Sequence, residues 1–190
     1  MRLTLMNANG TNVRLLVDSF DVRGAASWSP DGKWVAVAAN RGEGTRLFTI
    51  PVNGGPPVRL LDTLSYNPAW SPDGRFIVYS EQQSAGQFEV KAITPDRAPV
   101  PIVELQIVGF SSRIPYRFTP DGKGLIVLEG VIGTSQNFFR IELASGHRRQ
   151  LTDLTAGPVI HYFDVSPDGT QIVFDRLRDN SDVVLMNLSR

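Results

Sequence analysis

The sequence contains no cysteine and only two histidines, so several kinds of site lack the residues that build them. Without cysteine there are no disulfides, no thiolate metal ligands and no cysteine nucleophile. The 19 Lys and Arg balance the 19 Asp and Glu, and a net charge of zero creates no overall field that would attract nucleic acid. No segment approaches the roughly 20 apolar residues of a membrane helix, and residues 1–7 lack the apolar run of a signal peptide. The sequence therefore predicts no nucleic-acid partner and no membrane insertion.

Turn-forming residues are plentiful and evenly spread. The chain of 190 residues has 17 glycines and 13 prolines, and its 42% hydrophobic content is enough for a core. One tetrapeptide, Ser/Thr-Pro-Asp-Gly, occurs four times, at residues 29–32, 71–74, 119–122 and 166–169. The copies start 42, 48 and 47 residues apart, which is close to the period of roughly 40–50 residues typical of propeller blades.

Each copy predicts a tight corner between two antiparallel strands. Proline suits the second position of a type I turn, and glycine supplies the left-handed residue that closes a hairpin with a bulge. Apolar stretches that form the two corner strands precede and follow the copies, at 26–28 and 34–38, 68–70 and 76–79, 116–118 and 125–128, and 163–165 and 172–174. Third strands are predicted at 3–7, 46–52, 88–93, 138–143 and 183–188, and shorter fourth strands at 13–16, 58–61, 100–103 and 149–151.

No helix-period stretch competes with this reading, so the predicted fold is an all-β propeller of four-stranded antiparallel blades. The expected units are a partial blade at 1–23, blades at about 24–64, 65–112 and 113–158, and a partial blade at 159–190. Seventeen strands are one more than four closed blades require, so the chain either closes with four blades or forms an open arc of a larger propeller. Because it opens in mid-repeat and has no leader, we expect the C-terminal piece of a longer propeller protein. An open arc also leaves blade edges available for self-association.

The repeat resembles the Pro-Asp-Gly class of WD-like propeller repeat found in the TolB family. The residues that carry the resemblance are the Trp-Ser-Pro-Asp-Gly-Lys corner, the apolar run after it, and the later segment Leu-Phe-Thr-Ile-Pro-Val-Asn-Gly-Gly. The resemblance implies a periplasmic or other extracytoplasmic bacterial protein that acts as a scaffold or sensor. The segment 174–188 also resembles the ends of propellers fused to bacterial Ser/Thr kinases or winged-helix regulators, and prolyl-oligopeptidase relatives carry similar blades before a hydrolase domain.

No constellation of residues predicts catalysis or a metal site. His147 and His161 lack zinc-ligand spacing and are interpreted as surface residues. Residues 109–113, the nearest match to a Gly-x-Ser-x-Gly nucleophile elbow, lack the final glycine. Asp175, Asp179 and Asp182 do not have the spacing of a calcium loop and are interpreted as solvated carboxylates. We therefore expect no enzyme activity, no cofactor and no bound metal.

Binding is the expected activity, because a propeller displays its loops on two faces. The loops between second and third strands, and between fourth and first strands, are the longer and more varied ones. Aromatic and arginine side chains are favoured at interfaces, and the predicted partner-binding residues on this face are Tyr66, Arg113, Tyr116, Arg117, His161, Tyr162, Arg176 and Arg178. Trp28, Trp70 and Phe118 share one repeat position and are predicted to lie in the core between blades. The main hypothesis is a non-enzymatic module that binds a protein or peptide. The alternative is the propeller of a larger enzyme, such as a kinase, a winged-helix regulator fusion or a hydrolase.

Overall fold

The computed structural model describes residues 3–108, 116–131, 135–154 and 159–175, and every regular element in them is a β-strand. Among these residues no helix is present that could span a membrane. The strands are β1 (Leu3–Leu5), β2 (Arg14–Val17), β3 (Asp21–Trp28), β4 (Trp34–Asn40), β5 (Thr45–Pro51), β6 (Val58–Arg59), β7 (Ser65–Trp70), β8 (Ile77–Ser84), β9 (Gln87–Ile93), β10 (Pro99–Val108), β11 (Tyr116–Phe118), β12 (Gly124–Val131), β13 (Ser135–Glu142), β14 (Arg148–Gln150), β15 (Phe163–Val165) and β16 (Ile172–Phe174).

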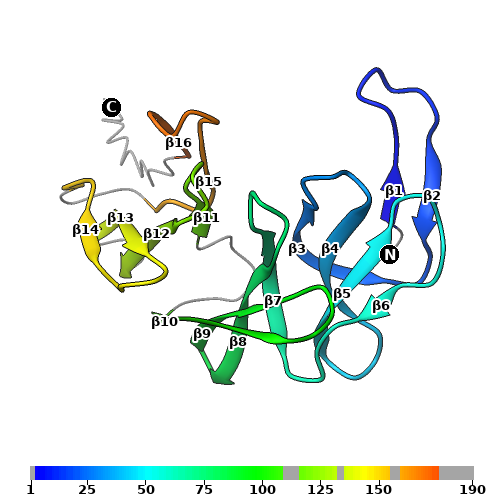
Figure 1. The fold of residues 1–190 in the computed structure, drawn as a ribbon, viewed down its shortest axis with the longest axis horizontal. Coiled ribbons are helices and arrows are strands. Elements are labelled where there is room, and N and C mark those ends of the chain that lie inside the picture. The colour runs from blue at the N-terminus through cyan, green and yellow to red at the C-terminus, as the bar shows by residue number, and fades with distance from the viewer. Residues whose placement is uncertain (1–2, 109–115, 132–134, 155–158, 176–190) are drawn as a thin grey trace, which may run out of the picture.

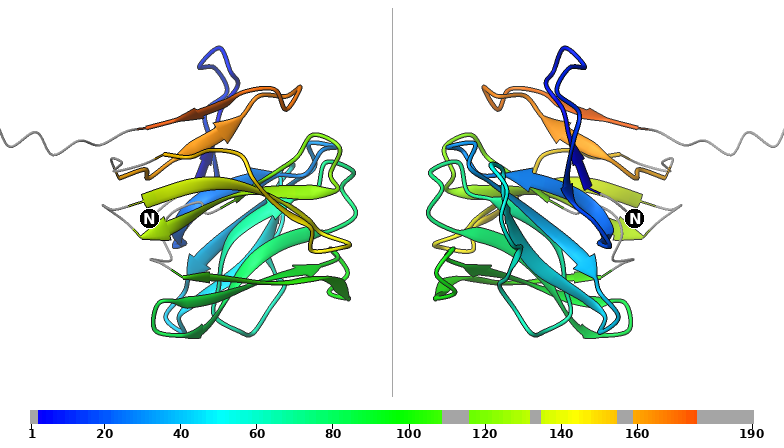
Figure 2. Two further views of the ribbon diagram at one scale, coloured as in Figure 1. Left: turned by 90° about the vertical axis from the view of Figure 1, so that its left-hand side faces the viewer. Right: turned by 90° about the vertical axis from the view of Figure 1, so that its right-hand side faces the viewer.

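These strands form three four-stranded antiparallel sheets and two two-stranded ones. The complete sheets are β3–β6, β7–β10 and β11–β14, each with its strands in chain order, and β1–β2 and β15–β16 stand at the two ends. Figure 1 shows the five sheets following one another along an arc, with β1 and β16 at opposite ends. The loop between β1 and β2 projects beyond the other sheets in both views of Figure 2. The all-β propeller fold is therefore confirmed, and within the described residues it has the form of an open arc.

Most predicted strands are present, with small differences at their ends. The strand predicted at 58–61 is shorter, as β6, and the one predicted at 100–103 is longer, as β10. A register shift between Val100 and Leu105 allows β10 to continue along β9 as far as Val108. The strand predicted at 183–188 lies outside the described residues. The complete sheets cover residues 21–59, 65–108 and 116–150.

The four corners are held by side chains as well as by turn geometry. At the first corner the Ser29 hydroxyl donates to Asp31 Oδ1 at 2.6 Å and accepts the Trp34 N–H at 2.9 Å, while Asp31 Oδ1 accepts the Lys33 N–H at 3.0 Å. The hydroxyl–carboxylate bond recurs at 2.5–2.7 Å in the pairs Ser71–Asp73, Thr119–Asp121 and Ser166–Asp168. These bonds hold the pKa of each corner aspartate below its ordinary value. The serine or threonine before the proline and the aspartate after it are therefore hydrogen-bonded to each other, which stabilises the turn.

Successive corners also touch one another. A side-chain carbon built on the corner glycine would lie 2.9–3.6 Å from Cδ of the proline in the preceding corner, in the pairs Gly74–Pro30, Gly122–Pro72 and Gly169–Pro120. These glycines have positive φ values of 67–73°, a conformation that glycine adopts without steric cost. Each sheet is therefore stacked on the previous one through its corner.

The core consists of apolar layers between neighbouring sheets. One layer joins the β3–β6 sheet to the next through Leu47, Trp70 and Ile77, and the following layer joins β7–β10 to β11–β14. A third layer joins β11–β14 to β15–β16, where the rings of Phe138 and Phe163 stand edge-on with centroids 5.0 Å apart. Because the complete sheets have strand residues covered on both faces, their second strands have the near-continuous apolar runs seen in the sequence.

Trp28 departs from the prediction that it lies in the core between blades. Trp70 at the equivalent position is 8% exposed, whereas Trp28 is 49% exposed. Trp28 faces the side of the β3–β6 sheet where only the two strands β1 and β2 precede it. The prediction for Trp28 is therefore wrong in this structure, because the burial of that position depends on strands of the preceding sheet.

Candidate functional site

The two faces of the arc carry different connections. Because strands alternate in direction within each sheet, the corners and the turns between third and fourth strands lie on one face. The connections between second and third strands, and from each sheet to the next, lie on the other, which we call the loop-rich face. The first strands β3, β7, β11 and β15 start at this face.

Tyr66 lies at the start of β7 on the loop-rich face and is partly buried. Its hydroxyl donates to Gln82 Oε1 at 3.1 Å, and its ring stands edge-on to Phe88 with centroids 5.6 Å apart. Two neighbouring strands thus fix the orientation of the ring, and part of it remains accessible to a partner.

Tyr116 is fully buried, so its predicted exposure on the loop-rich face is wrong. Its hydroxyl donates to the Asn67 carbonyl at 2.6 Å and lies 3.2 Å from the Ser80 hydroxyl, and burial raises its pKa. The strand partners of Tyr116 and Phe163, Val127 and Phe174, each lie five residues after their corner glycine, whereas the partner of Tyr66, Ser80, lies six residues after its own. Tyr116 is therefore one position further into its strand than Tyr66, and it joins two sheets instead of facing a partner.

Arg117 lies at the junction between β11 and β15. Its Nε donates to Asp164 Oδ1 at 3.0 Å, and its guanidinium carbon lies 5.7 Å from the centre of the Phe163 ring. The guanidinium is partly exposed, so Arg117 can present a positive charge while its ion pair with Asp164 orients it.

His161 and Tyr162 precede β15 and are held by one carboxylate. Asp175 Oδ1 accepts the backbone N–H groups of both residues at 2.8 Å, and Asp175 Oδ2 lies 3.8 Å from His161 Nδ1. Burial alone would raise the pKa of Asp175, but the two backbone hydrogen bonds hold it below its ordinary value. Tyr162 itself is 58% exposed. The carboxylate therefore fixes the backbone that presents Tyr162 to solvent.

Arg23 belongs to the same set and was missed by the sequence analysis. Arg23 pairs with Ala38, and Tyr66 pairs with Ser80. The two partners are equivalent, because each lies six residues after the glycine of its corner. A register shift follows both Arg23 and Tyr66 along their strands. The residue after Arg23 and the residue after Tyr66, Gly24 and Asn67, both have positive φ. Tyr162 occupies the same position: its carbonyl accepts the N–H of Asp175, which also lies six residues after its corner glycine. Aligning the chain on this bulge would have identified Arg23.

Three sheets therefore carry an arginine or a tyrosine at one position of the loop-rich face, and we call Arg23, Tyr66 and Tyr162 the rim residues. The Arg23 side chain is about half exposed and forms an ion pair with Asp21. Nearby, a cavity of about 230 Å³ crosses the first strands β3, β7 and β11 and is lined by Ala26, Ser27, Pro68, Ala69 and Arg117, among others. The predicted residues Arg113, Arg176 and Arg178 lie outside the described residues.

The described side chains of this face are suited to contacts with a partner. Within residues 3–108, 116–131, 135–154 and 159–175, no group of three or more His, Asp or Glu side chains could hold a metal ion. The carboxylates Asp21, Asp164 and Asp175 are each engaged by arginine or by backbone N–H groups. What the arrangement offers is a row of aromatic and cationic side chains with restrained orientations.

Comparison with known proteins places the fold. No family model matches the sequence. The uncharacterized peptidase YuxL of Bacillus subtilis is 28% identical over 151 residues, which are 77% of this chain and 20% of that protein. TolB from Acinetobacter baumannii superposes with a TM-score of 0.73 at 21% identity, over 95% of this chain and 44% of that one. An oligogalacturonate lyase solved with manganese superposes with a TM-score of 0.68 at 14% identity, over 95% of this chain and 55% of that one. The chain thus spans about a fifth of the curated relative and less than half of the Acinetobacter TolB. Its recurring corners, its stacked four-stranded sheets and these superpositions identify the chain as a TolB-like β-propeller by fold.

Proposed function

We propose that this chain is a non-enzymatic module that binds a protein or an extended peptide on its loop-rich face. The rim residues Arg23, Tyr66 and Tyr162 would contact the partner, together with Arg117 and His161. The observation that carries the proposal is the recurrence of arginine or tyrosine at one register position in three sheets. Tyrosine and arginine are the side chains that most often dominate interface energetics.

The geometry of the rim residues supports this role. Tyr66 is oriented by Gln82 and Phe88, and the backbone at Tyr162 is fixed by Asp175. Side chains ordered before binding lose less conformational entropy in a complex, which favours affinity. The zero net charge of the chain supports a protein partner over nucleic acid, for which a basic surface would be expected.

The test is selection of peptides from a displayed library on the chain, followed by affinity measurements on variants. We expect Arg23→Ala and Tyr162→Ala each to weaken the selected peptides about tenfold or more, as for interface hot spots. Lys33→Ala, at an exposed corner of the opposite face, is the matched control and should leave affinity unchanged. The proposal fails if no saturable binder is obtained, or if Lys33→Ala weakens binding as much as the rim variants.

A second candidate function is the propeller part of a larger enzyme. The similarity to a fifth of the length of a Bacillus peptidase favours it, and the superposition on a lyase shows that this fold also occurs in an enzyme. The gene sequence on both sides of the chain separates the candidates. A catalytic domain encoded there, with turnover that depends on the rim residues, would support the enzyme. Further Pro-Asp-Gly repeats alone would support a TolB-like binding protein.

We also propose that the chain acts outside the cytoplasm, as its resemblance to TolB implies. Fractionation of the native cells tests this. Recovery of the full gene product with the periplasmic or secreted fraction is the expected result, and recovery only with cytoplasmic proteins would contradict it.

A further inference from the structure

Two of the rim residues are each followed by a bulge in the first strand of their sheet. Residues 24–26 of β3, directly after Arg23, lie opposite a single residue of β4. Residues 67–68 of β7, directly after Tyr66, lie opposite a single residue of β8. A bulge bends its strand and changes the direction of the neighbouring side chains. The directions of Arg23 and Tyr66 therefore depend on how the two bulges are held.

Asn67, the first residue of the β7 bulge, has an unusual backbone conformation. Its φ is 52°, in the left-handed region that glycine adopts without steric cost, and it precedes Pro68, although a proline favours an extended residue before it. Of the four non-glycine residues with positive φ in the described part of the chain, Asn67 is the buried one, at 6% exposed. Such strain persists only where the surroundings hold it, and it is concentrated at functional sites. A buried asparagine where glycine would be unstrained indicates a role for its side chain.

Two contacts join Asn67 to the sheets on either side of it. From β11–β14, the buried Tyr116 hydroxyl donates to the Asn67 carbonyl at 2.6 Å. Toward β3–β6, Asn67 Oδ1 lies 3.4 Å from the position of a side-chain carbon built on Gly24, the first residue of the β3 bulge. The row of contacts Tyr116–Asn67–Gly24 therefore crosses the three complete sheets, one residue after Arg23 and one residue after Tyr66.

The far end of the β3 bulge is also tied to β7. Ser27, where regular pairing with β4 resumes, accepts the Trp70 N–H through its hydroxyl at 3.0 Å. Residues of both bulges, together with Arg117, line the cavity of about 230 Å³ on this side of the sheets. The β3 and β7 bulges are thus fastened to each other at two points, of which Asn67 supplies the one next to the rim residues.

We propose that Asn67 is a positioning residue for the partner-binding face. By fastening the β7 bulge to the β3 bulge, its side chain fixes the directions of Arg23 and Tyr66 relative to each other, so that both contact one partner together. This role in binding rests on the proposed function, whereas the coupling of the two bulges can be measured without a partner. Gly24, Asn67 and Tyr116 all lie in first strands of complete sheets.

Backbone NMR relaxation of the free chain tests the coupling. Asn67→Gly keeps a residue suited to the left-handed backbone and removes only the side chain that contacts Gly24. The amide order parameter of Gly24 should therefore fall from about 0.85, typical of rigid backbone, toward about 0.6. The amide of Gly32, at the corner of the same sheet, should not change. An unchanged order parameter at Gly24 overturns the proposal.

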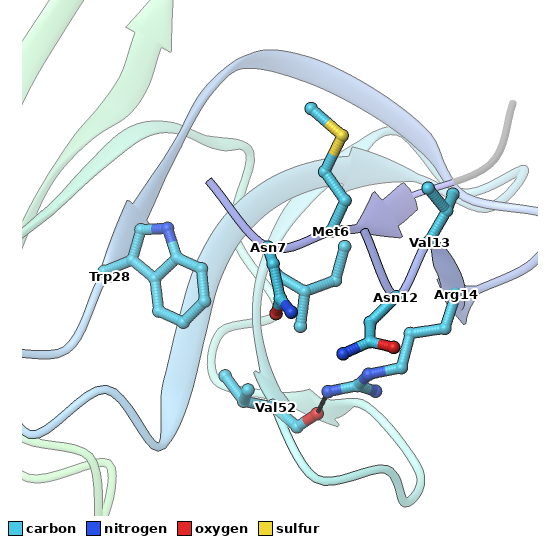
Figure 3. Close-up of a pocket in the computed structure, with 8 residues that line it drawn as sticks. Met6, Asn7, Asn12, Val13, Arg14, Trp28 and Val52 are labelled. Atoms are coloured by element: carbon cyan, nitrogen blue, oxygen red, sulfur yellow. Dashed lines mark hydrogen bonds between the residues drawn. The ribbon is translucent and has the colours of Figure 1, made fainter. Parts of the chain in front are cut away.

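Asn12→Gly is the matched control. Asn12 also has a left-handed backbone, with a φ of 54°, but its side chain is exposed. It belongs to the β1–β2 hairpin and lines, with Trp28 and Val52, a separate cavity of about 660 Å³ (Figure 3). No residue of either bulge lines that cavity. Asn12→Gly should leave the order parameter of Gly24 unchanged, and a fall as large as that in Asn67→Gly would refute a specific contact.

Affinity for a peptide selected on the wild-type chain is the second measurement, with circular dichroism to verify that each variant is folded. Asn67→Gly should weaken binding about tenfold, because ordering two loosened side chains costs conformational entropy. Arg23→Ala should then cost less affinity in the Asn67→Gly chain than in the wild type, because residues that act through a shared contact are not additive. An equal cost in both chains indicates a purely structural Asn67 and overturns the proposal. If no peptide is selected, the proposed binding function fails, and the order parameters still decide whether the bulges are coupled.

Discussion

Replacing Tyr116 by phenylalanine tests whether this residue joins two sheets or serves the surface. The substitution removes only the hydroxyl, which donates to the Asn67 carbonyl at 2.6 Å and lies 3.2 Å from the Ser80 hydroxyl. The ring should keep its place, because a phenylalanine, Phe163, occupies the equivalent position of its own sheet and is buried there. The loss is therefore confined to hydrogen bonds in a site with no solvent access.

The expected loss in the free energy of unfolding is about 1–3 kcal/mol, the usual cost of leaving a buried polar group without its partner. With a urea dependence of about 2–3 kcal/mol/M, the midpoint of urea unfolding should fall by roughly 0.3–1.5 M. Tyr162→Phe is the matched control, since that ring is mostly exposed, and it should change stability by less than about 0.5 kcal/mol.

A double-mutant cycle with Ser80→Ala isolates the bond between the two hydroxyls. We expect the two substitutions together to cost less than the sum of the single losses, because each removes the same contact. Equal stability of Tyr116→Phe and the wild type would refute the buried role of this residue. Weaker peptide binding by Tyr116→Phe at unchanged stability would instead indicate that Tyr116 contacts the partner.

Three further outcomes follow from the fold. The corner aspartates have folded-state pKa values below their ordinary 3.8, so the unfolded chain binds more protons in acid, and the urea midpoint should fall as the pH drops through about 4; an acid-independent midpoint would contradict this. Burial raises the pKa of Tyr79 to about 12. The urea midpoint should therefore be unchanged below pH 10, the ordinary tyrosine pKa, and should fall as the pH rises toward 12. The fall should be shallower in Tyr79→Phe. Val165→Phe should raise the free energy of unfolding by roughly 1 kcal/mol, because Phe118 occupies this position one sheet earlier and a cavity of about 570 Å³ adjoins Val165; calorimetry should show a lower melting temperature if the cavity cannot take the ring.

Much of the fold could be predicted from local signals, and the exceptions have a common cause. The corners depend on four consecutive residues, and the second strands depend on apolar runs such as 34–38, so both could be found without knowing their neighbours. The burial of Tyr116 depends instead on the adjacent sheet, where its partners Ser80 and Asn67 lie 36 and 49 residues away in the sequence. The exposure of Trp28 depends on the preceding sheet, of which the described residues contain only β1 and β2. Local composition contains no information about such contacts.

The candidate site was less predictable for a related reason. Tyr66, Arg117, His161 and Tyr162 were chosen by residue type and loop position, and the structure leaves each of them at least partly accessible. Arg23 was overlooked because its position is defined by a bulge in the pairing of β3 with β4. A side chain's direction along a strand reverses with each residue, so a single inserted residue decides which side chains reach the surface.

The glycine–proline contacts between neighbouring corners have a consequence for how such a protein can diversify. The corner starts are 42, 48 and 47 residues apart, yet each glycine still lies against the proline before it. The distance between neighbouring sheets is therefore fixed on the corner side of the molecule, whatever the length of chain between two corners. Insertions and deletions on the opposite side can accumulate without disturbing the scaffold, so new specificities can arise there while the architecture stays the same.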